Sequence, residues 1–301
     1  MKKPSFHPRA SAVGYYMRCA RRFDLDRQLS LGLTTLADLG LPTTTLDRTS
    51  SPPADFGTYA HWVLQCAMKA QFMSKMNDFA FTGWDPQAAN AAQPDASVLA
   101  HGAQLFSGGP TQAHNMAIQM AVLAAARMPK ADGWMAEAYG VIPKFLGGHI
   151  DFLSSDLLNI VDLKTTSTAP MNGKMKPAHA WQLAAYALLV YCATDILPEN
   201  GYIMYVHSRG EWVCRSQPIT FHSPAGQEML DFLHEKLEEM RRASPRSAFT
   251  PSMGSGCDED YCPYTSICRD RFIPRGTAVV RTPEPELVSL NPLEASHAID
   301  T

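Results

Sequence analysis

The stretch of sequence that decides the fold is Gly147-Gly148-His149-Ile150-Asp151-Phe152, followed by Ile160-Val161-Asp162-Leu163-Lys164-Thr165. Apolar and polar residues alternate in both segments, which is typical of strands. The intervening Ser154-Ser155-Asp156 predicts a turn between them. With the segment before them, the expected strands cover residues 135–142, 145–153 and 157–163.

These strands place three polar side chains together. Alternate residues of a strand face the same side, so Asp162 and Lys164 share a face while Val161 and Leu163 point into the core. The short turn brings Asp151 alongside them. We therefore expect two carboxylates and one amine to converge at a sheet edge.

A bare Asp-x-Lys triplet is more often a salt bridge on an exposed hairpin. Here an upstream Gly-x-x-Asp, an apolar strand and the following Thr165-Thr166-Ser167 occur together, which favours a site. Hard divalent cations prefer oxygen ligands, and two aspartates leave room for water and phosphate. A bound metal lowers the pKa of its water, and Lys164 could orient that water or stabilise the transition state. This chemistry suits phosphodiester hydrolysis.

The rest of the chain predicts helices around this core. The expected helices cover residues 10–29, a segment starting near 56, and 112–127, 178–193 and 222–242, with further strands at 201–207 and 211–216. We expect an α/β fold with a mixed central sheet flanked by helices. The expected regions are an N-terminal helical region (1–130), the core (131–246), a cysteine segment (247–275) and a poorly ordered tail (276–301).

Composition restricts the class of protein only loosely. The 301 residues are 46% hydrophobic and 18% charged, with a net charge of −3, which neither favours nor excludes a nucleic-acid binder. No apolar run is long enough for a membrane helix and no secretory signal is evident, so we expect a cytoplasmic protein without membrane contact. Local basic clusters, interpretable as solvated faces or as phosphate contacts, occur at Arg18, Arg21 and Arg22; Lys174 and Lys176; Arg241, Arg242 and Arg246; and Arg269, Arg271 and Arg275.

The two strand segments, taken with Gln182-Leu183-Ala184-Ala185-Tyr186, resemble the core of the PD-(D/E)XK nucleases, specifically their RecB-like exonuclease branch, which includes CRISPR-associated members. The resemblance implies a restriction-endonuclease-like core in which Asp151 and Asp162 bind metal and Lys164 is catalytic. Isoleucine precedes Asp151 where proline is the family's common residue. Gln182 and Tyr186 lie four apart on one helix face, and the resemblance places them near the active site; the alternative is that Tyr186 only packs in the core.

Two further ligands are suggested upstream. Gly57-Thr58-Tyr59-Ala60-His61 resembles a family element whose histidine binds metal, although a lone histidine in a helix is usually structural. A nitrogen ligand would make the site tolerant of Mn²⁺ as well as Mg²⁺. Glu137, on the preceding strand, is a candidate for a further carboxylate at the metal.

The cysteines near the end form a separate motif. Cys257, Cys262 and Cys268 lie close together, which in a cytosolic chain favours metal over disulfides. The resemblance to nucleases with iron–sulfur clusters implies Cys19 as a fourth ligand and a [4Fe–4S] cluster; structural zinc and unligated cysteines are the alternatives. Four residues separate Cys257 from Cys262, where two are usual in the family.

We therefore predict a metal-dependent DNA nuclease, an exonuclease acting on single strands or DNA ends in recombination, repair or replication. The first alternative is a DNA-end binding or processing subunit of a larger complex, such as CRISPR adaptation or phage recombination, with minor nuclease activity. The second is a restriction-type endonuclease. Protein partners and an oligomer are compatible with each.

Overall fold

The computed structural model of the chain describes most of the expected core. The described residues are 6, 8–42, 51–75, 94–142, 145–168, 173–242, 262–264 and 267–268. Cys257 and the expected tail, 276–301, lie outside this part of the chain. Among the described residues, no helix is both long and apolar enough to cross a bilayer.

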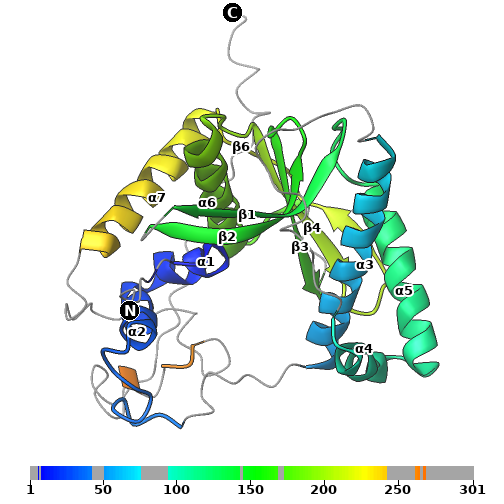
Figure 1. Cartoon of the computed structure of the whole chain (residues 1–301), viewed down its shortest axis with the longest axis horizontal. Helices are drawn as coiled ribbons and strands as arrows, with labels where there is room; N and C mark the ends of the chain where they lie inside the picture. The colour runs from blue at the N-terminus through cyan, green and yellow to red at the C-terminus, as the bar shows by residue number, and fades with distance from the viewer. Residues whose placement is uncertain are drawn as a thin grey trace, which may run out of the picture.

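A mixed sheet forms the centre of the molecule (Figure 1). Its strands are β1 (Trp134–Ile142), β2 (Leu146–Ser154), β3 (Asn159–Thr166), β4 (Asn200–His207), β5 (Val213–Arg215) and β6 (Ile219–Thr220). They run in the order β1-β2-β3-β4-β5, with β6 also paired to β4. Only β3 and β4 are parallel to each other; the other pairs are antiparallel.

Helices cover both faces of this sheet. The helices are α1 (Ala10–Arg18), α2 (Ala20–Ser30), α3 (Pro52–Lys75), α4 (Ala96–Gly102), α5 (Gly109–Ala125), α6 (Pro177–Thr194) and α7 (Pro224–Arg242), with a 3-10 turn at Ala103–Leu105. Figure 1 shows α1, α6 and α7 on one side of the sheet and α3, α4 and α5 on the other. Each side has its own apolar core. The expected α/β class with a mixed, helix-flanked sheet is confirmed.

The crossover from β3 to β4 is made by α6, which is apolar nearly all round and mostly buried. Such a helix belongs inside a protein rather than on its surface. Pro177 begins the helix, where its missing N–H has no helical partner to lose. Asp195, with φ 59°, ends it in the left-handed conformation common at helix C-termini. This helix carries Gln182 and Tyr186 across the face of β3.

Two expectations about the flanking segments were wrong. The helix predicted over 10–29 is broken at Cys19, whose backbone is extended (φ −150°, ψ 99°). The break lets α1 pack on α6 while α2 turns toward α7, where the Arg27 guanidinium donates to the Met240 carbonyl at 3.0 Å. No helix-breaking residue marks this position, so tertiary contacts account for it. The expected strand over 211–216 is shorter, and β6 was not predicted.

Candidate active site at the fork between two strands

The site lies where β2 and β3 separate. These strands pair only through Phe152–Val161 and Leu153–Ile160. The next opposing residues, Asp151 and Asp162, stand at the fork. In place of a strand partner, the Leu163 N–H donates to Asp151 Oδ2 at 2.7 Å.

This position corrects the expectation of a sheet edge. β3 lies between β2 and β4, so the site opens inside the sheet rather than at its margin. Asp162 is completely buried and Asp151 is 8% exposed. The two carboxylates thus lie in a protected split between strands, where charged groups are poorly solvated.

Glu137 joins the site from β1. The β1–β2 pairs Ala136–Phe152 and Ala138–Ile150 place Glu137 opposite Asp151. Its φ is 55°, a left-handed backbone conformation that residues other than glycine rarely adopt and that costs free energy. Gln65 of α3 donates a hydrogen bond to the Glu137 carboxylate. The local strain therefore accompanies a carboxylate turned toward α3 and the fork.

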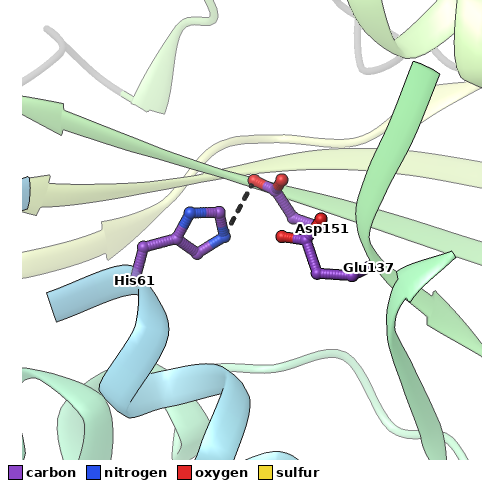
Figure 2. Close-up of side chains that lie close together, drawn as sticks. All are labelled: His61, Glu137 and Asp151. Atoms are coloured by element: carbon purple, nitrogen blue, oxygen red, sulfur yellow. Dashed lines mark ion pairs between the residues drawn. The ribbon is translucent and has the colours of Figure 1, made fainter. Parts of the chain in front are cut away.

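His61 reaches the same point from α3. Its Nε2 lies 3.4 Å from Asp151 Oδ2. Donor atoms of His61, Glu137 and Asp151 all lie within 4.8 Å of one another, and Figure 2 shows the three side chains converging from separate elements. Gly57 permits this approach, because a Cβ there would lie 2.9 Å from Thr165 Cβ at the end of β3. The Gly-x-x-x-His spacing therefore has a packing reason.

Asp162 organises the other half of the site. Its Oδ2 lies 2.7 Å from Lys164 Nζ, and its Oδ1 accepts a hydrogen bond from Gln182 Nε2 at 2.9 Å. Gln182 Nε2 also donates to the Tyr186 hydroxyl at 2.7 Å. The amide of Gln182 thus uses its donors to tie Asp162 to Tyr186. Tyr186 is 3% exposed, so it both packs in the core and belongs to this network.

Burial dominates the electrostatics of the two aspartates. It raises the pKa of Asp151 to about 6 and that of Asp162 to about 7, while the nearby Lys164 ammonium acts in the opposite direction. Burial works against the charge of Lys164, but Asp162 and Asp151 together raise its pKa. Burial lowers the pKa of His61, which keeps its imidazole neutral and able to bind a metal.

The donor set fits a hard divalent cation. Asp162 Oδ2 is buried, and its close neighbour is the Lys164 ammonium 2.7 Å away, which occupies only part of what a carboxylate oxygen can accept. A buried carboxylate oxygen with spare acceptor capacity is a suitable ligand atom, as are the facing oxygens of Asp151 and Glu137. His61 adds one nitrogen.

Sequence reasoning missed four groups around the site. They are Gln65, the Leu163 N–H, His179 and Tyr205. One signal was present in the sequence: Gln65 follows His61 by four residues on one helix face. The Leu163 N–H contact depends on where β2 and β3 separate, and the His179–Tyr205 contact depends on the packing of α6 against β4. Neither is set by a local pattern.

The described residues of the cysteine segment, 262–264 and 267–268, lie elsewhere, against α2. The Tyr264 hydroxyl donates to Asp26 Oδ1 at 2.5 Å, and the Tyr16 hydroxyl donates to Asp26 Oδ2 at 3.0 Å. Cys268 is buried, and Cys19 and Cys262 are partly buried. The described residues 262–264 and 267–268 therefore dock near the N-terminal helices, as Figure 1 also shows.

The family comparison agrees with this architecture. The model of the PD-(D/E)XK nuclease superfamily matches residues 10–269, and the chain therefore belongs to this superfamily. Its helix-flanked mixed sheet is the restriction-endonuclease-like fold predicted from the sequence.

Solved structures give more distant likenesses. The "Putative exonuclease" of Eubacterium rectale is 14% identical, with a TM-score of 0.45, over 97% of this chain and 94% of that one. The protein SSO0001 is 15% identical, with a TM-score of 0.28, over 70% of this chain and 84% of its own. The comparison with curated proteins gave no significant match.

Proposed function

We propose that this chain is a metal-dependent DNA exonuclease of the RecB-like branch that degrades single strands or works from DNA ends. The observation that carries the proposal is the convergence of Asp151, Asp162, Lys164 and His61 at the β2–β3 fork. Each comes from a motif with a family counterpart, and buried carboxylates beside an ammonium have little structural purpose.

In this proposal, His61, Asp151 and Asp162 hold Mg²⁺ or Mn²⁺, and Glu137 is a further carboxylate of the same site. When bound, the metal supplies a water of lowered pKa and positive charge facing the phosphate. Lys164 Nζ stabilises negative charge developing on the phosphate oxygens and counters the two aspartates. Gln182, held by Tyr186, fixes the orientation of Asp162.

We further propose that Cys19, Cys257, Cys262 and Cys268 hold a [4Fe–4S] cluster, with structural zinc as the alternative. Docking of residues 262–264 and 267–268 beside α2 supports this, because Cys19 immediately precedes α2. Purified protein should contain about four iron atoms per chain and show a broad visible absorption that bleaches on reduction. Stoichiometric zinc without iron would show that these cysteines hold structural zinc and not an iron–sulfur cluster.

The nuclease proposal is tested with end-labelled linear DNA, single- and double-stranded, beside a covalently closed single-stranded circle. We expect the linear single strand to be degraded in Mg²⁺ or Mn²⁺ and to survive in EDTA, with the circle resistant. Cutting of the circle would indicate an endonuclease instead. Binding without cleavage of any substrate would favour a DNA-end binding subunit.

A further inference from the structure

Helix α1 lies directly on the first turn of α6, beside the active site. A Cβ added to Gly14 would lie 2.6 Å from the Ala178 carbonyl oxygen and 2.7 Å from its Cα, so the two helices meet backbone to backbone. The next residue, Tyr15, is 37% exposed. This close crossing brings the exposed ring to the same end of α6 that faces β3 and β4.

Cationic side chains gather around that ring. The Arg22 guanidinium lies 4.1 Å from the centroid of the Tyr15 ring, a cation–π contact that covers one face of the ring. Burial, and then the charges of Lys164, Lys176 and Arg18, lower the pKa of His179 to about 3. Lys176 and His179, at the start of α6, both contact the hydroxyl of Tyr205, the strand partner of Lys164. Because Gly14 packs on Ala178 in the same turn of α6, the Tyr15 ring and these basic groups lie at the end of the helix nearest the proposed catalytic lysine.

His179 has a fixed hydrogen-bonding role in this surface. The Lys176 N–H donates to the Tyr205 hydroxyl at 3.1 Å, which leaves the Tyr205 proton for His179 Nδ1 at 2.9 Å. The neutral His179 therefore carries its own proton on Nε2 and offers it as a donor. Tyr205 is the strand partner of Lys164 in the β3–β4 register. The His179 donor, which is hydrogen-bonded to Tyr205, therefore lies next to the strand position of the proposed catalytic lysine.

Resting on the proposed nuclease function, we propose that Tyr15, backed by Arg22, is a stacking platform for one unpaired base of a single-stranded nucleic acid entering the site. Arg18, Lys176 and the His179 Nε2–H would hold the phosphates that flank this base. Interleaved aromatic and cationic side chains are how proteins grip single strands, because every base has a face that can stack. In a duplex that face is covered by the neighbouring base pairs, so the platform selects unpaired strands.

The test is binding in EDTA, without cleavage, of a fluorescein-labelled single-stranded oligonucleotide measured by anisotropy. Removing a stacked base costs about tenfold in affinity. We expect Tyr15→Ala to weaken binding about tenfold and Tyr15→Phe, which keeps the ring, to stay within about twofold. The matched control is Tyr191→Ala, which removes another exposed tyrosine at the far end of α6.

A series of oligonucleotides, each lacking one base, gives the decisive comparison. In the unsubstituted protein, one abasic position should weaken binding by the same factor as Tyr15→Ala. In Tyr15→Ala that same position should cause no further loss. Equal losses in both proteins, or unchanged binding by Tyr15→Ala, would overturn the platform.

Failure of this inference is distinguishable from failure of the nuclease proposal. Cleavage of single strands with no effect of Tyr15→Ala would leave the nuclease and remove the platform. If the protein never cleaves but Tyr15→Ala loses binding only at one base position, the platform stands and the nuclease proposal fails. Equal melting temperatures of the Tyr15 and Tyr191 variants would exclude misfolding as the cause.

Discussion

The β2–β3 fork and the docked cysteine segment are built in different ways. The fork residues Asp151, Asp162 and Lys164 lie within a short stretch of chain, on adjacent strands that fix their positions. The described residues of the cysteine segment instead contact α2, which lies far from them in the sequence, for example through the Tyr264–Asp26 hydrogen bond. If the fork carries out the proposed chemistry while the docked segment stabilises the fold, changes in the two regions should have separable effects on cleavage and on stability.

The largest effect should come from the fork. We expect Asp162→Asn to reduce cleavage by at least about a thousandfold, because the substitution removes a proposed metal ligand and the partner of Lys164. Calorimetric titration with Mn²⁺ should show a matching loss of metal affinity. Unchanged Mn²⁺ affinity and unchanged cleavage would show that Asp162 neither binds the metal nor contributes to catalysis.

The pH dependence of protein stability tests the same region. The folded-state pKa values of Asp151 and Asp162, about 6 and about 7, lie above their unfolded value of 3.8. Between about pH 4 and pH 7 the folded protein therefore binds more protons, and its free energy of unfolding in EDTA falls as pH rises. Stabilisation by Mn²⁺ should grow over this window, because the ligands must be deprotonated.

Melting temperatures between pH 4 and pH 8, with EDTA and with Mn²⁺, check this prediction. The variant Asp151→Asn with Asp162→Asn should lose most of the metal-free slope over this range. A slope that is unchanged in that variant would mean that other groups cause it.

Glu137 offers a smaller effect in which stability and function change in opposite directions. Glycine tolerates φ 55°, so Glu137→Gly should relieve backbone strain and stabilise the fold by about 1 kcal/mol. It should also weaken Mn²⁺ binding, as should Glu137→Gln, which keeps the strain. Urea unfolding and metal titration of both variants separate the two effects. Loss of stability in Glu137→Gly would contradict the proposed strain.

The smallest effect on cleavage should come from the docked segment. Tyr264→Phe removes the hydrogen bond to Asp26 and should lower the free energy of unfolding by about 1–2 kcal/mol. Cleavage per folded molecule should stay within about twofold, because this contact lies on α2 and away from the fork. Tyr191→Phe, at an exposed position, is the matched control. A large loss of cleavage in a variant that stays folded would show that the docked segment and the fork are functionally coupled.

Much of the fork could be predicted because strand alternation is local. The ion pair of Asp162 with Lys164 and the Gln182–Tyr186 contact follow from the period of a strand or a helix once the elements are placed. These periods need no knowledge of distant contacts. The fold class followed for the same reason. The approach of His61 to Asp151 joins distant elements and was predicted only from the family resemblance.

The rest depends on tertiary packing that no local pattern records. The break at Cys19 exists because α1 and α2 pack against different helices, although the local sequence suits one continuous helix. The His179–Tyr205 hydrogen bond needs α6 to pack against β4, a contact between two elements that no local pattern sets. The site inside the sheet, rather than at its edge, likewise follows from strand order.

The most direct test of the proposed mechanism is Lys164→Ala, assayed on end-labelled single-stranded DNA with Mn²⁺ while Mn²⁺ affinity is measured on the same preparation. Because Lys164 is assigned to the transition state and not to the metal, the variant should bind Mn²⁺ and lose cleavage by at least about a thousandfold. Cleavage at the unsubstituted rate by a protein that binds Mn²⁺ normally would contradict the assignment of the fork as the catalytic centre.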